Sequence, residues 1–586
     1  MTEHRHRSLP MSHSRSTLPA WIPPPLLAGF PPGYRRQWLA GDLGAGVTVA
    51  AYLIPQCLAY GELAGVEPIR GLWGILPALA IYALLGSSPQ LSVGPESTTA
   101  VMTAAAVGPL VASDPSTYAA LCGLLALLVG GICCLGAWAR LGFLANLLSR
   151  PILIGYMAGV AVIMIVGQVG RVSGLPMEGT FLPRVLMELW RQRGEIHLPT
   201  LLVAIGALVF LIGLHRRFPR APVPLLAVLA ATLVVAAFRL DQRGVAVIGA
   251  IPAGLPPFTL PRPPTAGQLR ALISAAVGVA LVGYSDNMLT ARSFAARNGY
   301  RIEANQELLA LGACNLGTGL FGGFPVSSSG SRTAIGDSLG SRSQLHSLAA
   351  LVVVVVVLLA LRPVLARFPL AALGAIVIYA ALRLIDVEGL RNLRRFRRSE
   401  FHLALITMAG VLLTDILVGV ALAVGLSVID LFARLMRPHA AVMGEVPNLA
   451  GLHDVGDWQG SRTLPGLVLY RYDAPLCFAN AEHFRHHALA AVEAERQPVQ
   501  WFVLNAEAII EIDSTAVESM AELCRELQQR GIVVGMARVK QELFALLERG
   551  GIVDLIGADR FYPTLPTAVS AFRAATRTAQ GDSARE

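Results

Sequence analysis

At residues 322–332 the chain carries the stretch GGFPVSSSGSR, in which Gly and Pro interrupt a long apolar region before a helix rich in small hydroxyl residues begins. A second stretch of the same kind, SVGPESTT at residues 92–99, stands at a comparable place in an earlier apolar region. A matched pair of such segments in the two halves of a membrane protein is typical of inverted repeats, whose broken helices meet at a midplane binding site. The pair predicts helix breaks at Gly94, Pro95 and Pro325, with a site between them.

The regions around these breaks are apolar enough to lie in a membrane. Hydrophobic residues make up 54% of the 586 residues and charged residues only 15%, against about 25% in soluble domains. A helix needs about 20 apolar residues to cross a bilayer, and about fourteen apolar stretches precede residue 438, two of them short. We therefore predict an α-helical polytopic membrane protein with about fourteen transmembrane segments, with about twelve or thirteen as the alternatives.

Basic residues are concentrated in every second loop between the apolar stretches, notably at Arg140 and Arg150 and at residues 215–220 and 391–398. Cytoplasmic loops carry such an excess of Lys and Arg. Membrane topology therefore explains the net charge of +9 better than nucleic-acid binding does. We predict a multi-pass protein of the bacterial cytoplasmic (inner) membrane with both termini in the cytoplasm.

The composition also divides the chain into domains. Residues 1–34 lack the apolar core of a signal peptide and are predicted to be a flexible cytoplasmic tail. After residue 437, expected strands at 467–470, 501–504 and 532–537 alternate with expected helices at 481–495, 514–530 and 541–549, which is typical of a small α/β domain. The predicted domains are a transmembrane domain at 35–437 with repeats at about 41–240 and 265–437, a cytoplasmic domain at 438–577, and a disordered tail at 578–586.

The two helix breaks have the chemistry of an anion site. A helix that begins at the midplane exposes backbone N–H groups and the positive end of its dipole. The hydroxyl groups expected to add hydrogen bonds to a substrate are those of Ser97, Thr98, Ser328 and Ser331. The alternative is a pair of proline kinks in which these hydroxyls only satisfy freed backbone groups.

Two charged residues stand out beside the breaks. Arg332 follows the second break, and we predict it to be an anion ligand, with a structural salt bridge as the alternative. Asp286 lies in an apolar helix with Thr290 one turn further on the same face. The pair is predicted to handle the coupling ion, either as oxygen ligands of Na⁺ or through a proton on Asp286; pairing with Arg332 is the alternative.

Gln56 and Tyr60 share one face of the first apolar helix and are predicted to line the same pocket, with ordinary interhelical hydrogen bonding as the alternative. Glu96, at the start of a half-helix, is expected to cap it. The sequence contains no GxxxxGK[ST] or HExxH motif and no Cys or His spacing typical of a metal site. We predict a protein that is not an enzyme, without cofactor or bound metal.

With these residues the chain resembles the sulfate permease (SulP) family, also called solute carrier family 26, from about residue 35 to residue 577. The resemblance is carried by YSDNMLTARSFAA at 284–296, NQEL at 305–308, IPQCLAY at 54–60, GPES at 94–97 and the stretch from Phe324 to Ala334. It implies seven plus seven inverted repeats in the uracil-transporter architecture, with a core domain that holds substrate between the third and tenth helices. It also implies a gate domain of helices five to seven and twelve to fourteen, an elevator-like movement of core against gate, and a homodimer.

The C-terminal domain resembles the STAS domain of such transporters and of anti-sigma factor antagonists. Residues Asp513, Ser514 and Thr515 match the loop whose hydroxyl is phosphorylated in the antagonists, Thr515 by position. Antagonists usually have Gly next, where this chain has Ala516. We therefore favour helix capping by Asp513 or Ser514 over a regulatory role, and the partner of the domain is left open.

The resemblance also bears on the substrate. Bicarbonate-transporting relatives hold Na⁺ with an Asp and a Thr spaced like Asp286 and Thr290, and their remaining ligands align with Ser328 and Gly330. Gly330 has no hydroxyl, and the stretch that ends at Arg332 looks more like sulfate-type members. We expect a small inorganic anion, sulfate first, coupled to H⁺. The alternatives are a Na⁺-coupled bicarbonate or dicarboxylate symporter, an uncoupled exchanger or channel, and a membrane-anchored regulatory scaffold.

Overall fold

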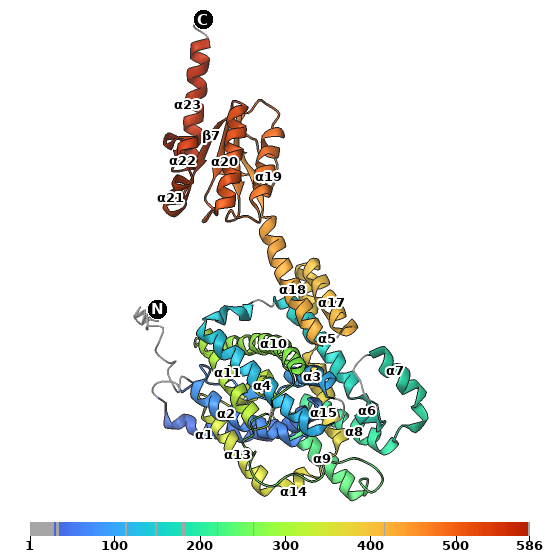
Figure 1. Cartoon of the computed structure of the whole chain (residues 1–586). Coiled ribbons are helices and arrows are strands. Elements are labelled where there is room, and N and C mark those ends of the chain that lie inside the picture. Colours follow the sequence, from blue (N-terminus) through green and yellow to red (C-terminus); the bar gives the residue numbers. More distant parts are fainter. Residues whose placement is uncertain are drawn as a thin grey trace, which may run out of the picture. The chain divides into compact units, whose positions relative to one another are not determined.

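The computed structural model describes residues 29–30, 34–111, 114–146, 149–177, 182–219, 221–261, 263–414 and 416–583. Nearly all of the predicted N-terminal tail, and the last three residues of the predicted C-terminal tail, lie outside these ranges. The chain forms two compact units that divide between Ser427 and Val428 (Figure 1). The first unit is almost entirely helical and the second is α/β, as predicted.

The first unit contains short strands β1 (Val93–Gly94) and β2 (Ser327–Ser328) among its helices. The helices are α1 (Leu39–Leu63), α2 (Ile69–Leu85), α3 (Ser97–Val107), α4 (Pro115–Trp138), α5 (Arg150–Gly167), α6 (Val169–Ser173), α7 (Leu182–Arg191), α8 (Leu198–Arg217), α9 (Val223–Ala237), α10 (Ala266–Asn298), α11 (Ala304–Leu320), α12 (Gly330–Ser338), α13 (Leu345–Ala360), α14 (Arg362–Leu365), α15 (Leu370–Leu384), α16 (Val387–Phe396) and α17 (Arg398–Leu413). Helix α18 (Ile416–Met436) continues into the second unit. Among the described residues, 7 helical segments are long and apolar enough to cross a membrane, and α2, α9 and α13 are shorter apolar helices.

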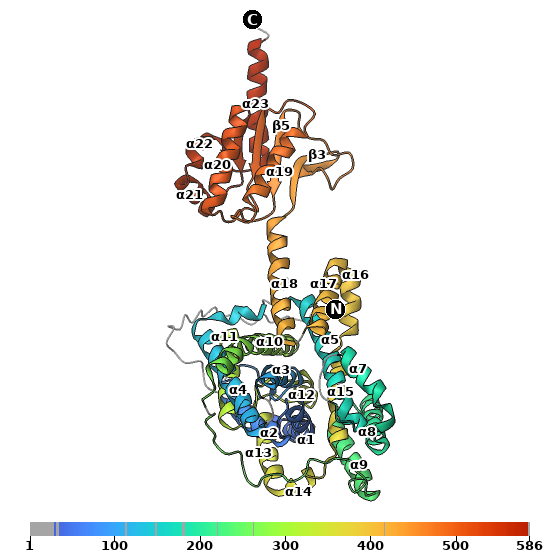
Figure 2. The same ribbon diagram turned by 45° about the vertical axis from the view of Figure 1, so that its right-hand side comes forward.

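The helices of the first unit pack in two groups, which Figure 2 shows side by side. The core group consists of α1–α4 and α10–α13, with its closest packing between α4 and α11, α1 and α13, and α2 and α11. The gate group consists of α5, α6, α8, α9, α15 and α17, and α15 packs on α5, α6, α8 and α9. Apart from α18, the division follows the predicted core and gate domains.

The two predicted helix breaks face each other inside the core group. The same order occurs twice along the chain, as α1, α2, β1, α3 and as α10, α11, β2, α12. Strands β1 and β2 pair antiparallel, with Val93 opposite Ser328 and Gly94 opposite Ser327. Gly94 and Pro95 therefore lie in the extended segment before α3, and Pro325 lies in the one before α12.

The second unit is a six-stranded sheet in the order β4-β3-β5-β6-β7-β8, parallel from β5 to β8. Its strands are β3 (Ala440–Val446), β4 (Leu449–Asp454), β5 (Leu467–Tyr472), β6 (Trp501–Asn505), β7 (Val533–Ala537) and β8 (Phe561–Tyr562). Its helices are α19 (Ala481–Glu493), α20 (Ser514–Gln529), α21 (Gln541–Arg549), α22 (Ile552–Ile556) and α23 (Leu565–Ser583). Helices α19–α22 share one apolar core with one face of the sheet, and α23 packs on the opposite face.

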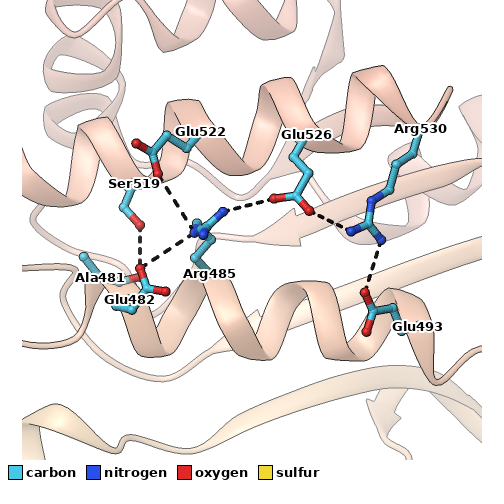
Figure 3. A network of polar contacts seen from close by, with 8 residues as sticks. All are labelled: Ala481, Glu482, Arg485, Glu493, Ser519, Glu522, Glu526 and Arg530. Carbon is cyan, nitrogen blue, oxygen red and sulfur yellow. Dashed lines mark hydrogen bonds and ion pairs between the residues drawn. The ribbon is translucent and has the colours of Figure 1, made fainter.

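Ion pairs between the charged faces of α19 and α20 add to this packing (Figure 3). Arg485 on α19 bonds Glu526 on α20 at 3.0 Å. Arg530, which follows α20, bonds Glu526 at 2.6 Å and Glu493 on α19 at 3.3 Å. These partly exposed pairs fix how the two helices lie against each other more than they add stability, since such pairs contribute at most about 1 kcal/mol each.

The three strands and three helices expected in this unit are present as β5, β6, β7, α19, α20 and α21. The disordered tail expected at 578–586 is wrong as far as Ser583, because α23 continues that far. Residues 578–583 read TAQGDS and are mostly poor helix formers, so this end of α23 extends a helix that Leu565, Val569 and Phe572 already anchor on the sheet.

Candidate functional site

A cavity of about 280 Å³ lies where α1, β1–α3, α10 and β2–α12 of the core group face α15 of the gate group. The structure brings eight of the nine predicted ligand and coupling residues together around it: Gln56, Tyr60, Ser97, Thr98, Asp286, Thr290, Ser328 and Ser331. Residues distant in the sequence by more than two hundred positions thus line one polar pocket inside an apolar bundle. Polar groups in such surroundings mark a substrate pathway by default.

Both half-helices present their N-terminal ends to this cavity, but only one of them is capped by a side chain. The carboxylate of Glu96 caps α3, accepting hydrogen bonds from the Thr98 backbone N–H at 2.7 Å and the Ser97 hydroxyl at 2.6 Å. Helix α12 has no side-chain cap, although Ser329 stands at its N-cap position. The first N–H groups of α12, with the positive end of its dipole, are therefore the ones available to an anion.

Two side chains at the cavity have unused hydrogen-bonding groups. In the part of the chain that the structure describes, the Ser328 hydroxyl and the Gln56 amide oxygen are buried without a hydrogen-bond partner. A buried polar group without a partner costs about 1–3 kcal/mol. Both groups are therefore suited to a polar ligand that enters the pocket.

Arg332 contacts the first half-helix. It is fully buried and is absent from the cavity lining. Its Nη1 donates to the Pro95 backbone oxygen at 2.8 Å, and its Nε donates to the Ser92 hydroxyl at 3.4 Å. The guanidinium thus braces the second half-helix against the first, while its Nη2 is buried without a hydrogen-bond partner among the described residues. A direct role for Arg332 as an anion ligand stays a prediction.

Asp286 and Thr290 lie one turn apart on α10 and both reach the cavity. A side chain at Gly330 would stand 3.9 Å from the Thr290 hydroxyl, so β2–α12 passes close to this pair. Asp286, Thr290 and Ser328 therefore line the same space. No cluster of three or more His, Cys, Asp or Glu side chains suited to a metal occurs among the described residues.

Arg383 is a cavity residue that the sequence reasoning missed. It extends from the end of α15, and its Nη1 bonds His215 Nε2 at 3.1 Å and Tyr379 Oη at 3.3 Å. Neither partner is an acid, so the guanidinium brings positive charge to the gate side of the pocket. The signal in the sequence was a lone Arg at the end of the apolar run of residues 370–384.

In the second unit, Asp513 is the cap of α20, as we favoured. Its carboxylate accepts from the Ala516 backbone N–H at 2.9 Å and from the Phe478 backbone N–H at 2.7 Å. Ser514 and Thr515 are exposed on the first turn of α20.

We expect Asp513→Ala to lower the stability of the first turn of α20 by about 1 kcal/mol, the usual contribution of an N-cap side chain. Hydrogen exchange of the full chain would show faster exchange at residues 514–518. Ser514→Ala is the matched control, because that side chain caps nothing. Equal exchange in the two variants would show that the cap contributes nothing to this helix.

Comparison with known proteins places the chain in a family. The profile of the sulfate permease family matches residues 39–407, and that of the STAS domain matches residues 461–568. A probable sulfate transporter of Mycobacterium tuberculosis is 53% identical over 558 residues, which cover 94% of this chain and 100% of the relative. Probable sulfate transporter 4.2 of Arabidopsis thaliana is 30% identical, covering 91% of this chain and 81% of the relative.

Solved structures show the same fold. Murine solute carrier 26 family member A9, an anion transporter in the inward-facing state, matches with a TM-score of 0.85 at 20% identity over 97% of each chain. The transmembrane domain of the cyanobacterial bicarbonate transporter BicA matches with a TM-score of 0.60 at 25% identity, over 66% of this chain and 98% of that one. With a family profile that spans most of the membrane unit and relatives that align along nearly its whole length, this chain belongs to the sulfate permease family and carries that family's membrane transport fold together with a STAS domain.

Proposed function

We propose that this chain imports sulfate together with protons across the bacterial cytoplasmic membrane. The observation that carries the proposal is one pocket that combines the uncapped N-terminus of α12, with its neighbouring hydroxyls, and the carboxylate of Asp286. The first feature suits an anion and the second suits a cation. Relatives named as sulfate transporters, one of them 53% identical, favour sulfate as the anion.

Electrostatics favours coupling over passive flow. A sulfate dianion in this pocket meets two carboxylates, those of Asp286 and Glu96, in a setting where charges interact strongly. A proton on Asp286 removes one of the repulsive charges, so anion and proton stabilise each other's binding. This mutual effect is the thermodynamic basis of symport.

The movement we propose is a shift of the core group against the gate group. The half-helices, Asp286 and Gln56 all belong to the core group, whereas Arg383 belongs to the gate group. A core that slides as one body carries the pocket past a fixed gate, which is an elevator-like form of alternating access. Fourteen membrane segments, formed by α1–α5, α8–α13, α15, α17 and α18, complete this arrangement, with both termini cytoplasmic and a homodimer as the assembly.

Uptake of radiolabelled sulfate into proteoliposomes tests the proposal. Parallel samples carry an inward pH gradient, an inward Na⁺ gradient, or neither. Uptake that follows the pH gradient supports the proposal. Uptake that is equally fast without any gradient contradicts proton coupling, and absence of sulfate uptake in a preparation that accepts bicarbonate or a dicarboxylate contradicts the substrate.

A Na⁺-coupled symporter is the second candidate, because the oxygens of Asp286, Thr290 and Ser328 face one space. Oxygen ligands suit hard cations. Gly330 gives that space no further side-chain oxygen, which is why the proton ranks first. In the uptake experiment this candidate requires that the Na⁺ gradient, and not the pH gradient, accelerates uptake.

The alternative from another functional class is a membrane-anchored regulatory scaffold. Deletion of residues 440–586 separates it from a transporter. Loss of a signalling output with transport unchanged would favour the scaffold.

Arg383→Gln is expected to raise the KM for sulfate about tenfold, since one charged contact contributes about 1.5–3 kcal/mol. Added salt should narrow the difference from wild type by screening the guanidinium. Arg383→Lys keeps the charge, so its KM should lie between those of wild type and Arg383→Gln. Arg391→Gln, an exposed position on α16 away from the cavity, is the matched control. Equal KM values for Arg383→Gln and Arg391→Gln would remove Arg383 from the anion site.

A further inference from the structure

A second cavity, of about 640 Å³, lies on the same core–gate interface as the substrate cavity. Helix α1 lines both: Tyr60 reaches the substrate cavity, whereas Glu62 and Leu63 line the second one. Helix α3 also lines both cavities. Thr98 lines the substrate cavity, and Val101, one turn further on, lines the second cavity. The second cavity therefore continues the interface directly beyond the substrate cavity.

The two cavities lie toward opposite ends of the bundle. Arg383 and Leu384, at the end of α15, line the substrate cavity and precede the basic residues 391–398. The second cavity is lined by the last turns of α1 and α5. Helix α5 begins with the basic residue Arg150, so its last turn lies at the end of the bundle away from the basic loops. By the proposed topology the substrate cavity faces the cytoplasm and the second cavity faces outward.

An ion pair joins the walls of the second cavity. Arg171 Nε, on α6 of the gate group, lies 2.9 Å from Glu62 Oε1, on α1 of the core group. The Glu62 side chain is only 11% exposed and that of Arg171 is 34% exposed. Arg171 also donates to the Glu62 backbone oxygen at 3.0 Å and to Gln168 Oε1 at 3.3 Å. All three bonds hold the guanidinium at the point where the two groups meet.

The surroundings of the Glu62–Arg171 pair in this cavity are unfavourable for an unpaired charge. Its other walls are largely apolar, with Val101, Ile163 and Leu412 among them. The amide nitrogen of Gln168 is buried there without a partner among the described residues. A largely buried charge that loses its partner is strongly destabilised, so the pair favours the arrangement in which Glu62 and Arg171 touch.

We propose that the second cavity is the outer part of the anion pathway and that the Glu62–Arg171 pair is its latch, which holds core and gate together on that side while the substrate cavity faces the cytoplasm. The inference rests on the proposed movement of core against gate. Opening the pathway outward requires the two residues to separate. When they separate, Arg171 and the free amide of Gln168 become groups that an incoming anion meets.

Cysteine accessibility tests the latch without substrate or gradient. Ala105→Cys places a thiol in the second cavity, and Ala380→Cys places one in the substrate cavity. A membrane-impermeant maleimide labels the first from outside in right-side-out vesicles and the second from the cytoplasmic side in inside-out vesicles. The chain without either added cysteine gives the background.

Adding Glu62→Gln is expected to accelerate labelling at Ala105→Cys about tenfold and to slow labelling at Ala380→Cys, because the population shifts toward the outward-open state. Opposite changes at the two sites identify a shift between states, whereas a general loosening of the bundle would accelerate both. The matched control is Glu67→Gln, which breaks the more exposed pair of Glu67 with Arg70 at 3.5 Å.

The charge swap of Glu62→Arg with Arg171→Glu is expected to return both labelling rates toward the wild-type values. It also keeps the inference testable if one single variant does not fold. Unchanged labelling in Glu62→Gln, faster labelling at both sites, or a swap that behaves like the single variant would each overturn the latch. Since no sulfate or gradient is used, a wrong substrate or coupling ion leaves this outcome unaffected.

Discussion

Asp286→Asn is expected to abolish the acceleration of sulfate uptake by an inward pH gradient, which lowers the driven rate about 5- to 150-fold, the usual range of a coupling free energy. Asn keeps the size and hydrogen-bonding capacity of Asp but neither binds nor releases a proton. Sulfate then binds without its coupling partner, so the gradient no longer drives it. The measurement is the initial uptake rate in proteoliposomes with and without the gradient.

Two variants make this result specific to proton binding at Asp286. Asp286→Glu retains an acid on the same face of α10 and should retain part of the driven uptake. Asp241→Asn removes an exposed acid in the loop after α9 and should behave like wild type. Driven uptake at the wild-type rate in Asp286→Asn would exclude this residue as the coupling site.

Glu307→Ala is expected to destabilise the membrane unit by about 3 kcal/mol or more, because several buried donors lose their acceptor at once. The Glu307 carboxylate, fully buried on α11, accepts from the Tyr82 hydroxyl at 3.0 Å and from the Asn287 amide at 2.9 Å. It also accepts from the Ser87 backbone N–H at 2.8 Å and the Ser87 hydroxyl at 2.7 Å. One side chain thus connects α2, the segment before β1, α10 and α11.

Thermal unfolding in detergent, followed by the loss of monodisperse protein, measures this effect. Glu303→Ala is the matched control, since Glu303 is exposed at the start of the same helix and makes no cap bond. Tyr82→Phe removes one donor while Glu307 still accepts from Ser87 and Asn287. This variant should lower the free energy of unfolding by about 1 kcal/mol. Similar unfolding temperatures for Glu307→Ala and Glu303→Ala would show that the network does not hold the helices together.

The sequence predicted the fold far better than it predicted the role of each side chain. Apolar run length, alternating basic loops and the paired Gly/Pro breaks are local signals, and they sufficed for the helical membrane unit, the repeats and the α/β domain. The strands β4 and β8 were missed because they lie at the edges of the sheet and β8 has only 2 residues, whereas β3, with the sequence AAVMGEV, was missed because it lacks a clear alternation.

The candidate site shows the same limit. Residue type and position correctly brought Gln56, Asp286 and Ser328 to one pocket, because each is polar in an otherwise apolar helix or break. The direction in which a side chain points cannot be predicted from its residue type and position. Arg332 turns toward the Pro95 carbonyl rather than the pocket, and Arg383 reaches the pocket from a different helix group. The direction of the Arg332 side chain depends on contacts more than two hundred residues away in the sequence.

The pairing of β1 with β2 has a consequence for substitutions in the pocket. The two half-helices are joined by the backbone ladder, by the bond from Ser329 N to Ser92 O at 2.9 Å, and by Arg332 on the Pro95 carbonyl. None of these links uses the side chains of Ser328, Ser331 or the position of Gly330. The frame and the lining of the pocket are therefore separable, so we expect substitutions at these three positions to change the pocket lining while the scaffold keeps its shape. We therefore expect the fold to tolerate single substitutions in the pocket lining.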